Sequence, residues 1–184
     1  MRGLRRKYPH KQVEVWAEDE GRLGLQPITR RVWALRGRRP RSYGQARYQW
    51  MYVYGFVQPK AGRFFHIFWP RVKTELMSQA LSEFAAWADP RGEKLVVLIV
   101  DNAGWHRAKK LAIPPNVLLH RLPPATPELQ PVEPLWSLIR ETVANRGFRY
   151  IGHLRMAVRR RCRWLAQNPE TVRGRVGFAW AQRL

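Results

Sequence analysis

The sequence of 184 residues predicts a mixed α/β domain, with N-terminal antiparallel hairpin strands, parallel central strands and flanking helices. Segments 48–57 and 63–69 are rich in aromatic and β-branched residues and are separated by QPKAG, which predicts a β-hairpin. The unbroken apolar run at 95–100 predicts a central strand that is buried on both faces. The predicted order is strands first, then helix, strand, strand, helix and helix, which is typical of a largely hairpin-built sheet covered by helices.

The first half of the chain supplies most of the predicted sheet. VEVWAED at 13–19 alternates apolar and polar residues and predicts a strand that ends on acidic residues. Segment 24–40 predicts a short pair of strands followed by a basic turn. Apolar residues recur at helical spacing from Thr74, the expected N-cap, and Asp-Pro-Arg-Gly at 89–92 ends this helix.

The second half predicts one more strand and two helices. VLLHRLP at 117–123 is the strand, and a proline-rich loop leads from it into a helix at roughly 131–145. A further helix is predicted at 151–167, where apolar residues oppose a row of arginines. Four tryptophans are predicted to belong to the core rather than to stack on bases: Trp33, Trp69, Trp87 and Trp136.

The length fits one domain with a sizeable core, which we divide into three parts. Residues 1–11 form a basic N-terminal segment, 12–150 form the main domain, and 151–184 form a basic helical extension of that domain. Hydrophobic residues make up 45% of the chain, so an intrinsically disordered protein is excluded.

The charge balance points to a polyanionic partner. The chain has 34 Lys and Arg against 13 Asp and Glu, a net charge of +21. Such a charge repels itself unless a polyanion is bound, and nucleic acid is the commonest polyanion. An anionic membrane surface is the competing explanation, but neither end of the chain carries a basic amphipathic anchor.

Cysteine content and hydropathy place the protein in the cytoplasm. The single Cys162 cannot form an internal disulfide or, alone, a zinc site. The N-terminal MRGLRRKYPHK has no apolar segment typical of a signal peptide. The longest apolar run is far too short for a membrane span, so we expect no membrane association.

Three acidic residues stand at the ends of predicted elements. Asp19 closes the first strand, Asp101 closes the central strand, and Glu133 lies in the first turn of the helix after the proline-rich loop. Ligands bind at the carboxyl ends of strands in α/β sheets. A carboxylate repels a polyanion unless a metal ion lies between them, and Mg²⁺ accepts both carboxylate and phosphate oxygens. Two such ions about 4 Å apart support in-line displacement at phosphorus.

Each of these residues also has an ordinary explanation. Asp19 is suited to open a turn, and Asp101 with Asn102 is suited to a plain strand-end turn. Glu133 is suited to the positive end of a helix dipole. The functional interpretation therefore depends on the order and context of the three acids.

Three sequence blocks carry a resemblance to a known family. LIVDNAGWHRAKKL and LPPATPELQPVEPLWSLIRETVANRGF resemble the catalytic domains of DDE transposases, in particular the bacterial insertion-sequence transposases related to the mariner superfamily. VWAEDEGRLGLQPITRRVWALRGRRP is similar to the block around the first aspartate of that family. The resemblance extends from about residue 13 to residue 149.

The resemblance implies an RNase H-like fold and a triad of metal ligands, Asp19, Asp101 and Glu133. It implies two Mg²⁺ ions, for which Mn²⁺ can substitute, and metal-dependent hydrolysis at the ends of a DNA element followed by strand transfer. It also implies element ends and target DNA as partners, and a homo-oligomer as the active form. The prolines before Glu133 would hold this residue at the start of its helix.

Five neighbouring residues are further candidates. Asn102 and His106 are predicted to contact the metal-binding carboxylates or substrate phosphates, with a purely structural role as the alternative. Residues that could clamp phosphates, or simply form a solvated basic face, are Arg107, Lys109 and Lys110. Glu18 and Glu20 flank Asp19 and should face the other side of an alternating strand, which favours structural roles.

The chain departs from the family in three ways. Gly104 stands where proline is frequent, and Gln130 stands where asparagine is frequent. Family members usually carry an N-terminal helix-turn-helix region, whereas the first strand here begins near residue 12. We therefore expect a second reading frame, a catalytic fragment, or a separate helix-turn-helix chain as partner. Two alternative functions stay open: a nuclease of the same fold with another role, and a non-catalytic DNA-binding relic.

Overall fold

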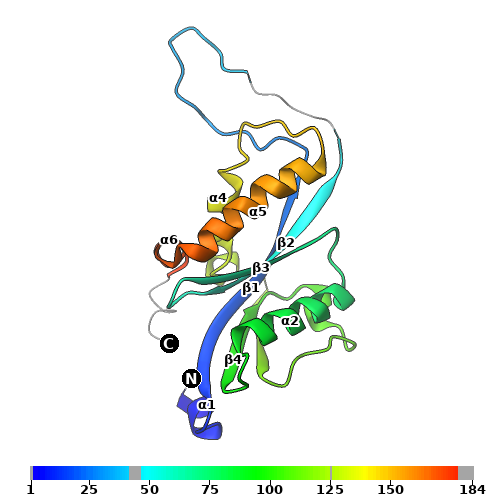
Figure 1. Ribbon diagram of the computed structural model, residues 1–184, viewed down its shortest axis with the longest axis vertical. Coiled ribbons are helices and arrows are strands. Elements are labelled where there is room, and N and C mark those ends of the chain that lie inside the picture. The colour runs from blue at the N-terminus through cyan, green and yellow to red at the C-terminus, as the bar shows by residue number, and fades with distance from the viewer. Residues whose placement is uncertain (1, 42–46, 125, 178–184) are drawn as a thin grey trace.

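The computed structural model describes residues 2–41, 47–124 and 126–177 and contains one five-stranded sheet in the order β3-β2-β1-β4-β5 (Figure 1). The strands are β1 (Gln12–Gly24), β2 (Trp50–Gln58), β3 (Arg63–Trp69), β4 (Lys94–Val100) and β5 (Val117–Arg121). β1, β2 and β3 pair antiparallel, whereas β1, β4 and β5 pair parallel. The predicted mixed sheet is therefore confirmed.

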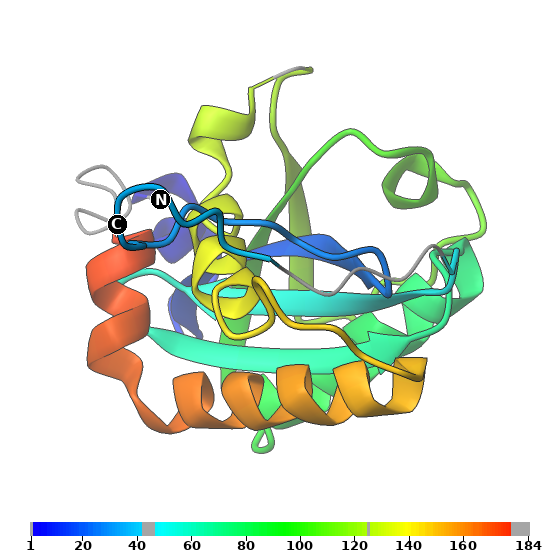
Figure 2. The same cartoon turned by 90° about the horizontal axis from the view of Figure 1, so that it is seen from above.

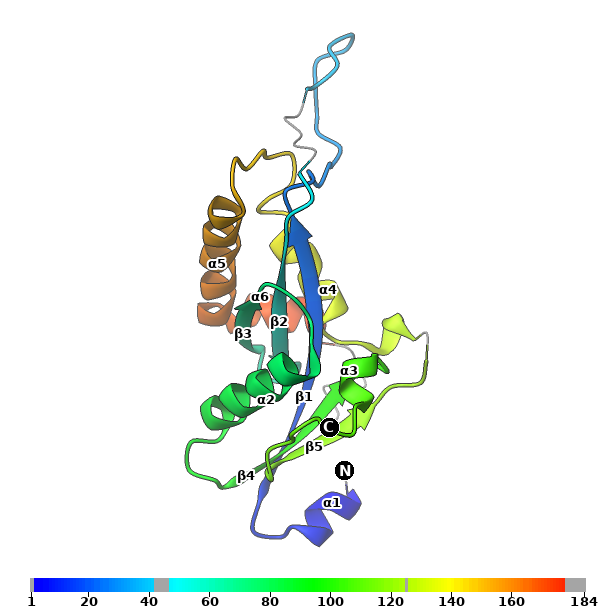
Figure 3. The same ribbon diagram turned by 90° about the vertical axis from the view of Figure 1, so that its right-hand side faces the viewer.

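Helices cover both faces of this sheet. The helices of the described residues are α1 (Arg2–Lys7), which lies at the start of β1 (Figure 1), α2 (Thr74–Ala88), α3 (Gly104–Arg107), α4 (Glu133–Arg140), α5 (Ile151–Gln167) and α6 (Pro169–Val176), with a 3-10 turn, η1, at Pro127–Leu129. One core layer joins the sheet to α4, α5 and α6, and a second layer joins it to α2. α5 runs along β3 (Figure 2), and α3 lies beside α2 (Figure 3). We call these the α4/α5/α6 face and the α2/α3 face.

β1 changes its pairing partners along its length. Residues 12–17 pair parallel with β4, and residues 17–24 pair antiparallel with β2. Ala17 lies opposite Ile99; Asp19 lies two residues further along β1, and Asp101 lies two residues further along the chain, directly after β4. The register therefore brings these two acids to the same level, where β4 ends and β1 continues.

Alternation along β1 separates three consecutive acids. Trp16 belongs to the core layer of α2, whereas Ala17 belongs to the layer of α4, α5 and α6. Since successive strand residues face opposite sides, Glu18 and Glu20 lie on the α2/α3 face and Asp19 on the other. The expectation that Glu18 and Glu20 face away from Asp19 is thus confirmed.

The strand pair predicted within residues 24–40 is wrong beyond the end of β1. Residues 25–41 form an irregular segment that projects past the sheet (Figure 1), and every side chain from 29 to 41 is exposed. Among the described residues, no strand of the sheet pairs with this segment, so a ladder of backbone hydrogen bonds does not form there. Trp33 is fully exposed (103%) and Trp87 is 41% exposed, so the prediction of core tryptophans is wrong for both. Trp69 is partly buried and Trp136 is buried, as predicted.

The helix predicted at 131–145 is shorter than expected. α4 ends at Arg140 and turns follow as far as Asn145, which has a positive φ of 57°. The Asn145 side chain accepts a hydrogen bond from Arg30 N–H and donates one to Arg30 O, and its own N–H donates to Ile28 O. These tertiary bonds replace the last turn of the predicted helix.

Other element ends differ by small amounts. Lys73, and not Thr74, occupies the N-cap position of α2, without a side-chain capping bond. β5 ends at Arg121 because Pro123, which follows closely, has no N–H to donate. The helix predicted at 151–167 is confirmed, whereas α1 and α6 were not predicted. Within the described residues, no helix combines the length and apolarity needed to cross a membrane.

Candidate active site

Asp19 lies near the middle of the long strand β1 and is held by a helix from the other end of the chain. The indole Nε1–H of Trp136 donates to Asp19 Oδ2 at 2.7 Å. Burial raises the pKa of Asp19, the hydrogen bond from Trp136 opposes this, and the charges of Glu133 and Asp101 raise the pKa further. Asp19 is therefore a fixed carboxylate that feels two other carboxylates nearby.

Two glycines make room for the indole ring of Trp136. A Cβ atom on Gly21 would lie 2.7 Å from Trp136 Cε3, and one on Gly55 would lie 2.9 Å from Trp136 Cη2. Both distances are shorter than real Cβ contacts, so any larger residue would push the ring away. The sequence thus uses two side-chain-free positions on β1 and β2 to let α4 reach Asp19.

Asp101 is the first residue after β4, and its side chain is about half exposed (49%). Its Oδ1 atom accepts two hydrogen bonds, from Ala103 N–H at 2.9 Å and from His106 Nδ1–H at 2.8 Å. The bond from His106 lowers the pKa of Asp101; partial burial opposes this, and the bond from Ala103 supports it. Asp101 is therefore ionised, oriented through one oxygen and accessible through the rest of its carboxylate.

Glu133 is the first residue of α4, is exposed, and is followed by Pro134 in the first turn. The loop before it is tied to β1, because the buried Gln130 donates from Nε2 to Glu18 O at 3.0 Å. Glu133 N–H in turn donates to Gln130 O at 3.2 Å. Gln130 thus links the loop that carries Glu133 to the strand that carries Asp19.

The three acids open into one cleft of about 330 Å³. Asn102 also lines it, and its side-chain amide donates to Leu122 O, which joins the ends of β4 and β5. The remaining wall is supplied by backbone and side chains of the proline-rich loop: Pro123, Pro124, Thr126, Pro127 and Gln130. The structure therefore brings together Asp19, Asp101, Asn102 and Glu133.

The three predicted basic residues lie outside the lining of this cleft. Arg107 and Lys109 are exposed on and after α3, and Lys110 pairs with Glu75 of α2. The geometry assigns them no contact with the acids, so their phosphate-clamping role stays a prediction.

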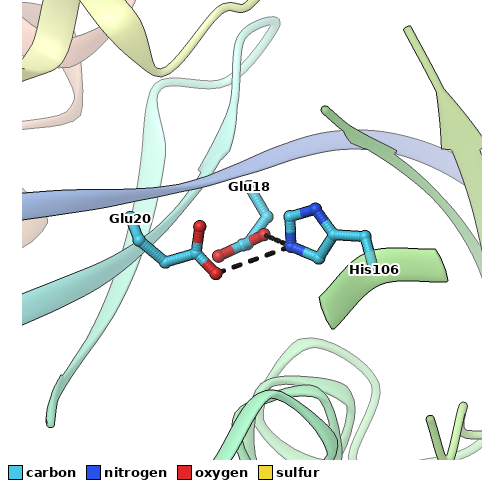
Figure 4. A group of neighbouring side chains, drawn as sticks. All are labelled: Glu18, Glu20 and His106. Carbon is cyan, nitrogen blue, oxygen red and sulfur yellow. Dashed lines mark ion pairs between the residues drawn. The ribbon is translucent and has the colours of Figure 1, made fainter. Parts of the chain in front are cut away.

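His106 contacts Asp101 through one ring nitrogen, and its other ring nitrogen faces Glu18 and Glu20 (Figure 4). Its Nδ1–H bonds Asp101, and its Nε2 lies 3.2 Å from Glu18 Oε2 and 3.5 Å from Glu20 Oε1. Burial alone would lower the pKa of His106, but the bonds with the three carboxylates outweigh burial and raise it to about 12. Burial raises the pKa of Glu18, and the charge of Glu20 adds to this.

Several partners of the triad were not expected from the sequence. Trp136 was predicted as core only, although its position three residues after Glu133 places it on the same first turn of α4. Glu18 and Glu20 were assigned generic structural roles, and no sequence signal connected them to His106. Such a contact depends on the α3 turn folding back over β1, which no local pattern encodes.

The donor set of the cleft fits a hard divalent cation. It offers carboxylate oxygens from three separate elements, and oxygen donors are what Mg²⁺ and Mn²⁺ prefer. The mutual repulsion that raises the pKa of Asp19 is the repulsion a cation would relieve.

Comparison with known proteins gives matches of two kinds. The chain is 40% identical over 101 residues to the uncharacterized protein y4pE/y4sA of Sinorhizobium fredii, covering 54% of this chain and 73% of that one. It is also similar to solved structures of the Mos1 transposase: a strand transfer complex (15% identity, TM-score 0.57), a pre-cleavage transpososome (13%, 0.60) and a paired-end complex with Mg (14%, 0.58). Each covers 96% of this chain, which spans 58–60% of the Mos1 chain.

At these identities the Mos1 structures establish a shared RNase H-like fold, with the mixed sheet and flanking helices described above. The family model of the DDE superfamily endonucleases matches residues 14–155, well over half of the chain. This match spans all three acids of the cleft. The chain therefore belongs to the DDE superfamily of endonucleases.

Proposed function

We propose that this chain is the catalytic domain of a DNA transposase. It would hydrolyse a phosphodiester at the end of a DNA element, leaving a 3′-hydroxyl, and then direct that hydroxyl onto a phosphodiester of target DNA. The observation that carries the proposal is the opening of Asp19, Asp101 and Glu133 into one cleft at the end of β4.

In this proposal the three acids hold two Mg²⁺ ions, with Mn²⁺ as a substitute. Such ions, when bound, activate the attacking oxygen and stabilise the leaving oxygen. The chain's own task is positioning: Trp136 fixes Asp19, His106 and Ala103 N–H fix Asp101, and the Gln130 bond fixes the loop before Glu133. Asn102, on the cleft wall, is suited to contact a substrate phosphate.

The partners follow from charge and from the related structures. A net charge of +21 suits a DNA backbone, and Arg107, Lys109 and Lys110 would contact phosphates beyond the cleft. The Mos1 structures include paired-end and strand transfer complexes, which supports element ends and target DNA as ligands and a homo-oligomer as the active form. A separate helix-turn-helix chain would recognise element ends, and a DNA substrate agrees with the cytoplasmic location expected from sequence.

Cleavage of supercoiled plasmid DNA tests the proposal. The chain should nick DNA only with Mg²⁺ or Mn²⁺, and Asp101→Asn should reduce the rate by roughly a thousandfold or more, since it removes one ligand from a unit that acts together. Glu83→Gln, an exposed carboxylate of α2 outside the cleft, is the matched control and should cleave normally.

Equal cleavage by the native chain and Asp101→Asn would overturn the triad. A chain that binds DNA with the steep loss between about 50 and 200 mM salt expected of phosphate contacts, yet never cleaves, would be a DNA-binding relic instead.

A further inference from the structure

The α2/α3 face of β1 carries a buried cluster that the proposed reaction does not use directly. It consists of Glu18, Glu20 and His106, whose nearest ligand atoms all lie within 4.8 Å of one another (Figure 4). The side chains of Glu18 and His106 are fully buried, and that of Glu20 is 4% exposed. None of the three lines the cleft of Asp19.

The polar atoms of this cluster face one another at ion-pair distances but form no hydrogen bond of normal geometry. Both carboxylate oxygens of Glu18, Oε1 of Glu20 and Nε2 of His106 are buried without one among the described residues. Buried polar atoms are nearly always satisfied, and an unpaired buried charge is costly. These atoms therefore require a positive charge between them, which either a proton on His106 Nε2 or a metal ion in the place of that proton can supply.

The hydrogen bond to Asp101 defines what His106 offers. Asp101 is an acceptor, so His106 Nδ1 must carry the hydrogen of their 2.8 Å bond. In the neutral ring, Nε2 then presents a lone pair toward the oxygens of Glu18 and Glu20. Lone pairs and carboxylates repel one another, and a cation placed between them turns the repulsion into coordination.

We propose that Glu18, Glu20 and His106 form a second metal site, separate from the triad, for a transition-metal ion such as Zn²⁺ or Mn²⁺. Ligands around a tetrahedral ion with bonds of about 2.1 Å are about 3.4 Å apart. The distances from His106 Nε2 to Glu18 Oε2 and Glu20 Oε1, 3.2 and 3.5 Å, lie on either side of this value.

The chemistry of the donors distinguishes this site from the cleft. An imidazole with two carboxylates suits Zn²⁺ or Mn²⁺, whereas Mg²⁺ prefers oxygen donors and keeps several waters. Metal-binding histidines usually donate their other N–H to a carboxylate, as His106 does to Asp101. Full burial is typical of a structural ion, which here would fasten α3 to β1 and so orient Asp101 from behind.

Metal content after purification with Zn²⁺ and dialysis against excess Mg²⁺ tests the site. The background variant is Asp19→Asn with Glu133→Gln, which disables the triad but keeps the Asp101–His106 bond. We expect about one Zn²⁺ per chain in this variant and in the native chain, as a closed protein site retains its ion. X-ray absorption should detect an imidazole nitrogen ligand, which the triad does not contain. Glu20→Gln should lose at least about nine-tenths of the bound Zn²⁺, and the control Glu83→Gln should keep it.

Three results would overturn the site: a folded native chain without retained Zn²⁺, a retained ion without a nitrogen ligand, or retention that Glu20→Gln leaves unchanged. In that case a proton on His106 Nε2, and not a metal ion, would pair with Glu18 and Glu20. If Glu20→Gln does not fold, the metal count and absorption spectrum of the native and background chains decide alone. None of these measurements depends on DNA cleavage, so the site and the proposed reaction can fail independently.

Discussion

The two faces of the sheet treat neighbouring acids of one strand in opposite ways. On the α4/α5/α6 face, Asp19 opens into a cleft and is held by the indole of Trp136. On the α2/α3 face, Glu18 and Glu20 are closed off from solvent around His106. One residue of displacement along β1 therefore separates an acid that can meet a substrate from two that cannot.

The two faces also surround their histidines with groups of opposite charge. His106, among carboxylates, has a pKa raised to about 12. His66 of β3, on the α4/α5/α6 face, has a pKa lowered to about 4 by burial and by the charges of Arg159 and Arg163. The α2/α3 face thus surrounds its buried histidine with carboxylates, whereas the α4/α5/α6 face places exposed arginines near a partly buried histidine.

The largest effect we expect concerns His66, whose ring stacks on Phe64. Its folded pKa of about 4 lies below the unfolded value of 6.5, so the unfolded chain takes up the proton first. The neutral ring contributes its full stability above pH 6.5, and this contribution is lost as the pH falls to about 4. The unfolding free energy should fall by up to about 3 kcal/mol over this range. Urea unfolding of the native chain and His66→Gln at both ends of this range isolates the effect, because all other groups titrate in both proteins. An equal acid loss in both would show that this face tolerates a cation.

Removing the hydrogen bond to Asp19 is the next test. Trp136→Phe keeps an aromatic ring against Gly21 and Gly55 but loses the N–H donor. Loss of a group that orients a metal ligand typically lowers metal affinity about ten- to hundredfold. Cleavage should therefore need about 10 to 100 times more Mn²⁺. Trp164→Phe, at an exposed indole of α5, is the control and should leave the Mn²⁺ requirement unchanged. An unchanged Mn²⁺ requirement in Trp136→Phe would mean that packing alone positions Asp19.

The smallest effect sharpens the role of the glycines. Gly21→Ala places a methyl group 2.7 Å from the Trp136 ring, and such overpacking should cost at least about 1 kcal/mol of unfolding free energy. Gly152→Ala in α5 meets no atom within 4 Å and should instead stabilise the chain by about 0.5–1 kcal/mol. Thermal unfolding of both variants measures the contrast, and a neutral Gly21→Ala would mean that α4 moves freely against the sheet.

The sequence predicted those parts of the fold that depend on local patterns. The hairpin follows from aromatic and β-branched segments, the central strand from an unbroken apolar run, and the helix at 151–167 from apolar periodicity. All three patterns respond to burial. The strand pair within 24–40 was wrongly predicted because a local pattern does not show whether a segment packs against the sheet, and residues 29–41 are exposed. The end of α4 was missed because the bonds between Asn145 and Arg30 join residues far apart in the chain.

The acidic residues of the candidate site could be predicted from the sequence, but the residues that hold them in place could not. Asp101 and Glu133 stand at element ends, which can be read from sequence. Asp19 was predicted to close its strand, and this was wrong, because β1 continues to Gly24 along its partner β2. The partners that fix them come from elsewhere: Trp136 donates to Asp19 across 117 positions, and Gln130 to Glu18 O across 112. Contacts at such separations are determined by how the layers pack, and a single sequence carries no pattern for them.

The alternation of β1 also sets where this gene can tolerate changes in length. One codon inserted or removed between Ala17 and Asp19 would exchange the two sides of the strand beyond it, turning Glu18 or Glu20 into the cleft and Asp19 toward His106. The exposed arm at 31–41 pairs with no strand among the described residues, so insertions and deletions there leave the acids in place. Related genes that vary in length should therefore vary within this arm and keep the codon count of β1 constant.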